Sequence, residues 1–269
     1  EIIIKVNDNF ILENSSIVSD VKIDETRENT FTPIGNGGDI KITAKNLSMI
    51  STNNELNTLI ATSTFGEGDG GDIVLYIDNK FEISGANASI SSGAKKESIG
   101  NGGDICIGNC NNINISPNLF ILENGGQITV SNQGVLNAGD IAITADFMIA
   151  FPNKNLITAD AGLGNGGEIE ITTNAIFSGN ITNISTTIVD SEFLLMSADS
   201  KSRLGLNGTI DIDTPEVDPT SGLITLPESP VDASKLIDQN FCKVGKDSEF
   251  IITGKGGLPQ FPNDTLTPN

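Results

Sequence analysis

The chain of 269 residues has no histidine, no tryptophan, one tyrosine and only three cysteines. It is also poor in cations, with 15 Lys and Arg against 35 Asp and Glu, and its formal net charge is −20. Nucleic acids and anionic lipid surfaces are bound by clustered Lys and Arg, so we expect neither as a partner. No apolar run reaches the length of a membrane-spanning helix, and we predict no membrane span.

The cysteines and the missing histidines also bear on metals. Cys106 and Cys110 are separated by three residues, and Cys242 lies far downstream. An odd number of cysteines cannot form a complete set of intramolecular disulfides. Structural zinc is held by four Cys or His side chains, which this pattern does not offer. We therefore expect a stray thiol or a disulfide near the C-terminus, and no metal or other cofactor.

What the sequence does contain is a repeated phrase. "GNGGDIKI" at 35–42 returns as "GDGGDIVL" (68–75), "GNGGDICI" (100–107), "NAGDIAI" (137–143) and "GNGGEIEI" (164–171), with a degenerate copy "NGTIDI" at 207–212. A period of about 30 residues is typical of solenoids and repeat arrays. The acids that follow the glycines are Asp39, Asp72, Asp104, Asp140 and Glu168.

Each period divides into three short strands, because apolar residues alternate with polar ones. The first strand follows the acid and has inward pairs such as Ile40/Ile42, Ile73/Leu75 and Ile105/Ile107. The third is centred on Ile60, Ile90, Ile128 and Ile157. For the second strand, we predict as inward residues Leu47/Met49, Phe81/Ile83, Ile113/Ile115, Phe147/Ile149 and Ile176.

Three strands per period in a constant order predict an all-β fold, a parallel β-helix of about six to seven coils over residues 1–213. A β-sandwich of hairpins would instead need two-residue turns between long strands, without a threefold sub-pattern. In the coil, Ile40, Ile73, Ile105, Ile141 and Ile169 should stack about 4.8 Å apart. The glycines should form a sharp corner with positive φ, where a side chain would clash with the neighbouring coil.

The corner acids allow three interpretations. Calcium binds Gly-rich Asp turns, but the motif concerned repeats every nine residues rather than every thirty. Glycosidic chemistry needs two carboxylates in different environments, whereas these acids are interchangeable members of a column. The interpretation we favour is structural: each acid hydrogen-bonds nearby backbone N–H groups. We predict no catalytic, cofactor-binding or metal-binding residue.

The segments outside the regular repeat are polar loops and a proline-rich end. Loops 24–34, 51–58 and 92–99 vary in length, and in solenoids such loops usually carry binding specificity. Residues 214–269 are expected to be a mostly irregular tail that caps the open edge of the last coil. Within it, 231–241 could form a short helix with Asp232 as N-cap, and 248–254 could form a strand.

The glycine-acid repeats and three ordered segments of the tail together resemble a known family. The segments are "DPTSGL" (218–223), "VDASKLI" (231–237) and "FIITGKGGLP" (250–259). They are similar to the C-terminal portion of filamentous-haemagglutinin-like exoproteins of the cyanobacterial kind. The resemblance implies a right-handed parallel β-helix, export by two-partner secretion through an outer-membrane pore, and adhesion or aggregation at the cell surface. It carries over no catalytic residues, and residues 1–34 do not match the family's N-terminal secretion domain, so we expect that region to lie upstream.

The function predicted from the sequence is therefore a secreted or cell-surface adhesin, a rigid stalk that presents loops and is not an enzyme. Its partner would be a carbohydrate or protein on a host, a neighbouring cell or the surrounding matrix. The alternative is a carbohydrate-active β-helix, a lyase or hydrolase. Against that alternative, the only two arginines, Arg27 and Arg203, are far apart in the chain. A third hypothesis is a secreted repeat protein that folds around calcium.

Overall fold

The structure is a computed structural model that describes residues 1–21, 34–52, 55–95, 98–178, 182–184, 187–190, 193–202 and 204–215. The chain divides into two units, Glu1–Glu216 and Val217–Asn269. The second unit lies outside the described residues, and so do the helix expected at 231–241, the strand expected at 248–254 and the proposed cap. Cys242 falls in the same region.

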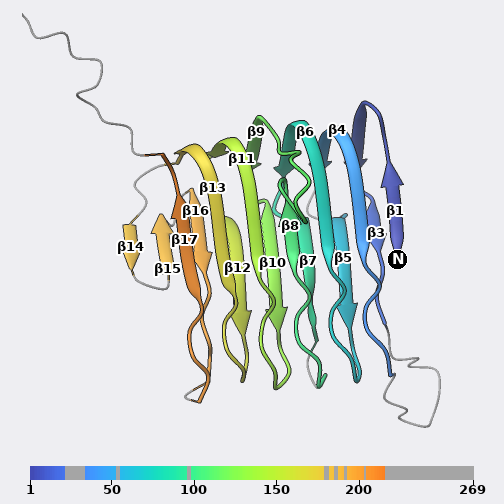
Figure 1. The fold of residues 1–269 in the computed structure, drawn as a ribbon, viewed down its shortest axis with the longest axis vertical. Helices are drawn as coiled ribbons and strands as arrows, with labels where there is room; N and C mark the ends of the chain where they lie inside the picture. The colour runs from blue at the N-terminus through green and yellow to red at the C-terminus, as the bar shows by residue number, and fades with distance from the viewer. Residues whose placement is uncertain are drawn as a thin grey trace, which may run out of the picture. The chain divides into compact units, whose positions relative to one another are not determined.

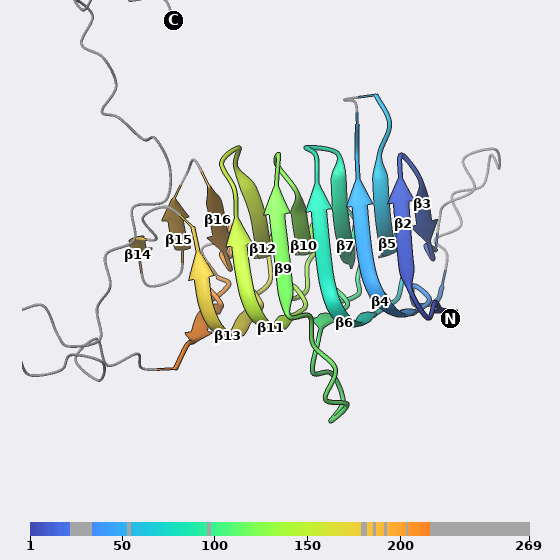
Figure 2. The same ribbon diagram turned by 90° about the horizontal axis from the view of Figure 1, so that it is seen from above.

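The described residues form two long sheets whose strands run side by side along the coil (Figures 1 and 2). Their strand order follows the chain, coil after coil, except at the end of the second sheet, where the order is β12-β16-β15-β14. The first sheet contains β1 (Ile2–Lys5), β2 (Asn9–Glu13), β4 (Ile40–Ile50), β6 (Ile73–Ser84), β8 (Ile105–Ile107), β9 (Leu119–Glu123), β11 (Ile141–Ala150), β13 (Glu168–Phe177) and β17 (Thr209–Asp213). The second contains β3 (Ser16–Val18), β5 (Thr58–Thr64), β7 (Ala88–Ala94), β10 (Gln127–Asn132), β12 (Asn155–Ala161), β14 (Thr182–Ile184), β15 (Thr187–Asp190) and β16 (Leu194–Ser197).

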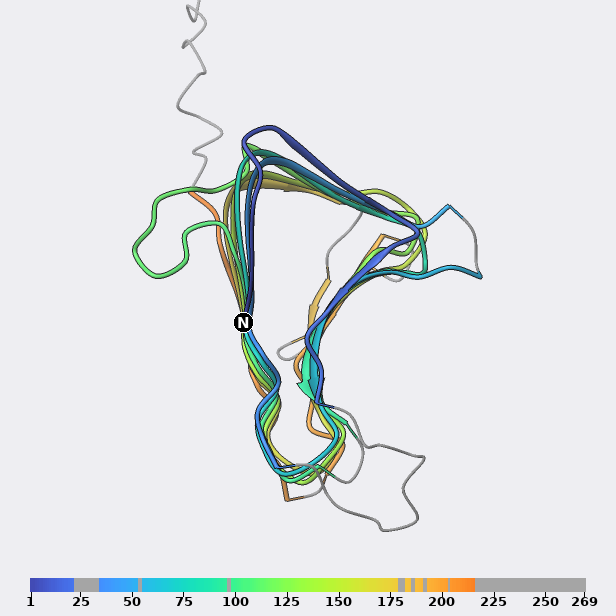
Figure 3. The same cartoon turned by 90° about the vertical axis from the view of Figure 1, so that its right-hand side faces the viewer.

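This arrangement confirms the predicted parallel β-helix. Seen along its axis, the coil has three walls and a glycine-rich bend (Figure 3). The first sheet bends to form two of the walls, because β4, β6, β11 and β13 each run through the predicted first and second strands without a break. The order β1-β4-β6-β8-β11-β13-β17 gives six coils and the beginning of a seventh within the described residues.

The predicted isoleucine ladder forms the interior of the first wall. Ile73 pairs in register with Ile40 on one side and with Ile105 on the other, and all three are buried. The ladder continues at both ends, and its full membership is Ile2, Ile40, Ile73, Ile105, Ile141, Ile169 and Ile210. No single coil could bury these side chains alone, so stacking of coils and formation of the core are one event.

The other two walls contribute ladders of their own. In the third wall, the predicted residues Ile60, Ile90, Ile128 and Ile157 lie in register and are buried. In the second wall, Phe81 and Phe120 stack with ring centroids 4.8 Å apart and planes 7° from parallel. Burying an aromatic or aliphatic side chain of this size stabilises the fold by about 1.5–3 kcal/mol.

Two of the inward pairs predicted for the second wall are wrong. Ile113 and Ile115 lie outside the strands, and Phe120 and Leu122 of β9 occupy the interior instead. In β11 the interior residues are Met148 and Ala150, whereas Phe147 and Ile149 point outward. The number of residues at the bend explains the second error: two residues separate Ala145 from Met148, but three separate Ile77 from Phe81, and one residue reverses the inward and outward faces.

Parallel pairing is broken only at the far end of the second sheet, as far as the described residues reach. There β15 pairs antiparallel with β14 and with β16. The next neighbour, β12, pairs parallel with β16 in the usual register. The antiparallel hairpin is thus an insertion at the edge of the coil and leaves the regular stack intact.

The paired glycines are required by close stacking, as predicted, but not by positive φ. A Cβ on Gly71 would lie 2.6 Å from the carbonyl oxygen of Gly38, and one on Gly70 would lie 2.7 Å from the nitrogen of Gly103. Both glycines have ordinary φ values, so the predicted left-handed backbone is wrong for them. Positive φ values occur two residues before the glycine pair, at Gly35 and Gly68.

Candidate functional site

The predicted corner acids form one column on the outside of the coil. In each step the Oδ1 atom of an aspartate accepts a hydrogen bond from the backbone N–H of the acid in the next coil. The backbone carbonyl of Asp72 at the same time accepts the N–H of Ile40, 2.8 Å away. The N···Oδ1 distances are 3.0 Å for Asp72 to Asp39, 2.9 Å for Asp104 to Asp72, 2.8 Å for Asp140 to Asp104 and 2.7 Å for Glu168 to Asp140.

The expected hydrogen bonds to backbone N–H groups are present at Asp39, Asp72, Asp104 and Asp140. The N–H groups bonded by the carboxylates belong to the next coil rather than to the same turn, so each acid joins two coils. Asp104, in the middle of the column, has a pKa raised by burial; the hydrogen bond from Asp140 lowers it, and the charges of Asp72 and Asp140 raise it again. Within the described residues, no group of three or more Asp, Glu, Cys or His side chains could hold a metal ion.

A second column lies three residues before the acids and was not predicted. Here too a side-chain Oδ1 atom accepts the N–H of the equivalent residue one coil on. For example, Asp69 donates its N–H to Asn36 at 3.0 Å and accepts that of Asn101 at 2.7 Å. The sequence signal for this column was the Asn or Asp that opens each copy of the phrase "NGGD" and its variants. The members are Asn36, Asp69, Asn101, Asn137 and Asn165.

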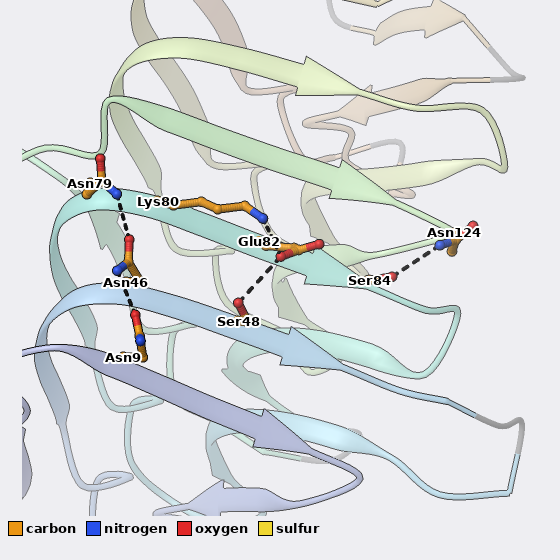
Figure 4. A network of polar contacts seen from close by, with 8 residues as sticks. All are labelled: Asn9, Asn46, Ser48, Asn79, Lys80, Glu82, Ser84 and Asn124. Atoms are coloured by element: carbon orange, nitrogen blue, oxygen red, sulfur yellow. Dashed lines mark hydrogen bonds and ion pairs between the residues drawn. The ribbon is translucent and has the colours of Figure 1, made fainter.

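A third column marks the bend between the first two walls (Figure 4). The side-chain amide of Asn46 donates to Asn9 at 2.7 Å, and that of Asn79 donates to Asn46 at 2.8 Å. Asn118 continues the column with a bond of 3.2 Å to Asn79. These three columns place polar side chains on the outside of the coil, but their hydrogen bonds are directed along the stack rather than toward a partner.

The one large interruption of the regular coils lies between β8 and β9, as far as the structure describes the chain. Residues 108–118 leave the coil at the bend between the first and second walls and project from the stack (Figures 2 and 3). In β4 the same bend consists of only two residues, Lys45 and Asn46. We call this segment the projecting loop. Loops 51–58 and 92–99 are described only in part and loop 24–34 only at Ile34, so the loop with the most distinct structure is one that the sequence analysis did not select.

Besides the hydrogen bonds at its two ends, the projecting loop is held against the coil by two links. A disulfide joins Cys106 in β8 to Cys110, with the Cα atoms 5.9 Å apart, which corrects the expectation of a stray thiol at these positions. The hydroxyl of Tyr76 donates to the carbonyl of Cys110 at 3.3 Å. Tyr76 occupies the outward position of Thr43 one coil earlier, yet it is buried. On its other side, the ammonium of Lys41 lies 5.0 Å from the ring centroid.

A polar cavity of about 480 Å³ lies beside the projecting loop. The loop supplies one side, and the outward residues of β11 and β13 supply the floor. The cavity contains amides, hydroxyls and two carboxylates but no cationic side chain. Its lining residues are Asn109, Asn114, Ser116, Thr144, Ala145, Asp146, Thr172, Thr173, Asn174, Asp213 and Pro215.

Two smaller cavities of about 430 and 380 Å³ lie on the outer face of the second sheet. They meet on β10, and their floors consist of small or hydroxyl-bearing side chains such as Ala61, Ser91, Thr129 and Thr158. The smaller cavity includes Asn57 of loop 51–58 in its lining, but neither cavity lies beside the projecting loop. The projecting loop and the cavity beside it are therefore the best candidate for a functional site.

Comparison with known proteins yields no relative. No protein-family model, no curated protein and no solved structure matches the chain. The described part of the chain contains no helix with the length and hydropathy that a membrane span requires. The functional argument therefore depends on the residues and geometry of this chain.

Proposed function

We propose that the chain is part of a secreted or cell-surface adhesin of the filamentous-haemagglutinin-like kind, a rigid β-helical stalk without catalytic activity. The observation that carries the proposal is the contrast between a regular stack and one projecting loop. The three polar columns are used for bonds between coils, whereas the loop is linked to the coil by a disulfide and borders a polar cavity. Solenoids commonly bind partners through irregular loops on a regular body.

Two further properties support a place outside the cell. Disulfides persist in oxidising compartments such as the cell surface and the periplasm, and the Cys106–Cys110 bond is outward on the stack. A formal charge of −20 keeps the chain soluble and repels anionic surfaces. Export by two-partner secretion, through an outer-membrane pore that recognises a region upstream, is part of the proposal.

The chemistry of the cavity indicates an uncharged, hydroxyl-rich partner. Its carboxylates, Asp146 and Asp213, would repel an anion, and its amides and hydroxyls can both donate and accept hydrogen bonds. A neutral carbohydrate on a cell or matrix surface has this character. Protein partners lacking negative charge at the contact remain compatible with the same lining.

Adhesion can be tested with beads coated with the full chain and applied to surfaces of neutral glucan, alginate and fibronectin. We expect retention on neutral glucan and loss of retention when Asn109 and Asn114, which line the cavity, are both replaced by alanine. The matched control replaces Asn111 and Asn112 by glycine, because these residues of the same loop have positive φ and do not line the cavity. Absence of retention on all three surfaces, or equal loss in both variants, would contradict the proposal.

The carbohydrate-active alternative is tested by incubating the same protein with neutral and acidic polysaccharides. A lyase releases unsaturated ends and a hydrolase releases reducing ends. We expect neither product to accumulate above the level of a heat-denatured control. Release of either product would replace the adhesin proposal with an enzymatic one.

A further inference from the structure

The outer face of the second wall changes character along the stack. Two columns of outward side chains run along it; both are polar at β4 and β6 and apolar from β9 to β13, and the second also begins with the apolar Ile11 of β2. The apolar end, which we call the apolar patch, consists of Leu119, Ile121, Phe147, Ile149 and Phe177. The first column is Asn46, Lys80, Leu119, Phe147 and Ala175, and the second is Ile11, Ser48, Glu82, Ile121, Ile149 and Phe177.

The apolar patch is exposed at its two aromatic residues and half-buried at Leu119, Ile121 and Ile149. The side chains of Phe147 and Phe177 are 43% and 56% accessible, and their ring centroids lie 6.3 Å apart on neighbouring strands. The patch spans three successive strands, β9, β11 and β13. Contiguous exposed apolar surface of this kind usually marks a contact with another macromolecule, because leaving it in water is unfavourable.

The same face shows what a solvated wall looks like in this protein. In β6 the equivalent positions hold Lys80 and Glu82, which form an ion pair of 2.8 Å, and Ser48 lies beside Glu82 on β4 (Figure 4). These polar residues need no partner. The switch to Leu and Ile one coil later, in β9, and to Phe in β11 and β13 is therefore a local property of these three strands, and not a general property of the wall.

We propose that the apolar patch is a self-association surface, at which two copies of the chain pack face to face. Outward side chains of a parallel stack repeat about every 4.8 Å, and a second copy necessarily has the same spacing, so the side chains of the two patches interdigitate as in packed sheets. A twofold axis uses the same surface on both chains and closes the assembly at a dimer. The patch contains no charged residue, so the contact brings no like charges into direct opposition.

The size of the patch and the charge of the chain determine the strength of this contact. Three strands at about 4.8 Å, each with about three to five residues at about 3.3 Å, cover about 140–240 Å², whereas stable interfaces bury about 800 Å² per partner. Each copy also has a formal charge of −20, which opposes association and is screened by salt. The dimer is therefore weak and reversible, and it strengthens as the salt concentration rises.

The test is sedimentation velocity over a wide range of protein concentration, at low and at high sodium chloride. All proteins carry Cys242→Ser, so that disulfide-linked dimers cannot form through that residue. We expect the weight-average sedimentation coefficient to rise with concentration, more steeply at high salt. Replacing Phe147 and Phe177 together by serine should raise the dimer dissociation constant at least about tenfold, because aromatic anchors dominate such contacts.

The matched control is Ile11→Ser, which removes an apolar side chain that is 61% exposed on the same face but lies outside the apolar patch. It should dimerise like the parent protein. Circular-dichroism melts of all variants establish that the coil is intact, and the outward position of the replaced residues predicts unchanged melts. The proposal is overturned if the parent stays monomeric at every concentration and salt, which would assign the patch to a different partner, or if the double variant dimerises as tightly as the parent.

This self-association is independent of the adhesin proposal. Retention on glucan depends on the side chains of the projecting loop that line the cavity, whereas dimerisation depends on the outward side chains of β9, β11 and β13, so the Asn109/Asn114 variant should still dimerise. The Phe147/Phe177 variant should still be retained. Failure of one experiment therefore leaves the other standing.

Discussion

At the residue scale, the repeated phrase encodes two hydrogen-bonding positions with one geometry. Each position needs an oxygen on the γ carbon that can reach the N–H of the next coil, and both Asn and Asp provide it. Asp69 stands in a column of asparagines and bonds in the same way as they do. Buried or half-buried backbone N–H groups are almost always bonded, so the columns complete the backbone ladder where the corner interrupts it.

Asp104 separates the role of the oxygen from that of the charge. Asp104→Asn keeps the oxygen that accepts the N–H of Asp140 and removes a charge that lies between two others. Asp104→Ala removes the oxygen and leaves that N–H without its partner, at a cost of about 0.5–1.5 kcal/mol. We therefore expect the Asn variant to be at least as stable as the parent at neutral pH in urea unfolding, and the Ala variant to be less stable. Equal losses in both would show that the charge itself is needed.

The raised pKa of Asp104 predicts a pH dependence. A carboxyl whose folded pKa is above its unfolded value binds its proton more tightly in the folded state. Its contribution to the free energy of unfolding therefore grows as the pH falls from neutral through the folded pKa, and is complete below the unfolded value of about 3.9. The advantage of Asp104→Asn over the parent should shrink between pH about 7 and about 4 in paired urea titrations. A wider gap at the lower pH would contradict this.

Sequence reasoning found the acid column because Asp beside Gly has a known way of bonding backbone. It missed the Asn column because asparagine is common in any turn, and its bonds connect residues about 30 positions apart. It also missed the disulfide, since Cys106 lies in a strand and Cys110 in a loop whose path depends on Tyr76. Local patterns predict local bonds, whereas these contacts depend on how neighbouring coils are placed.

At the scale of the elements, the corner permits the coils to stack only if its glycines stay small. Gly71→Ala would place a methyl group 2.6 Å from a backbone oxygen of the neighbouring coil, which cannot move without disturbing the stack. We expect a loss of about 1–3 kcal/mol in the free energy of unfolding. Gly162→Ala is the control, because its nearest neighbour would be 3.4 Å away, and its effect should stay within about 0.5 kcal/mol. Similar losses in the two variants would refute the stacking argument.

The strands show how far a periodic pattern can be followed. Alternation predicted the first and third walls correctly, because a glycine corner or a turn resets the phase once per coil. In the second wall it was right for Leu47/Met49 and Phe81/Ile83. It failed in β11, where a bend of two rather than three residues places Met148 instead of Phe147 inward. The alternation also failed at Ile113 and Ile115. These residues alternate with polar ones as in a strand, but they belong to the projecting loop, which forms no strand.

The projecting loop should behave as a separate unit from the coil beneath it. Replacing Cys106 and Cys110 together by alanine removes its covalent link, but the walls of the coil keep their own ladders. We expect faster amide exchange at residues 108–118 and unchanged protection in β6 and β11, measured by hydrogen–deuterium exchange. Tyr76→Phe, which loses only one hydrogen bond, should produce a smaller change of the same kind. Loss of protection throughout the strands would instead make the disulfide part of the core.

At the scale of the whole molecule, the stability of the chain should depend strongly on ionic strength. A formal charge of −20 favours expansion, and the acid column adds repulsion along the axis of the coil. At physiological ionic strength the Debye length is about 8 Å, so added salt screens neighbouring coils only in part and distant charges almost fully. We therefore expect the urea midpoint to rise with sodium chloride, and to rise less in Asp104→Asn.

The same titration separates screening from specific calcium binding. Calcium chloride and magnesium chloride are compared with sodium chloride at equal ionic strength. Carboxylates that are used for bonds between coils should gain similar stability from both divalent ions, because screening depends on charge and not on coordination. A calcium site would raise the midpoint well beyond magnesium at the same concentration, since the two ions differ in coordination number and ligand distance. That result would replace the structural account of Asp39, Asp72, Asp104, Asp140 and Glu168 with a metal-binding one, because linkage to a bound ion stabilises only the state that binds it.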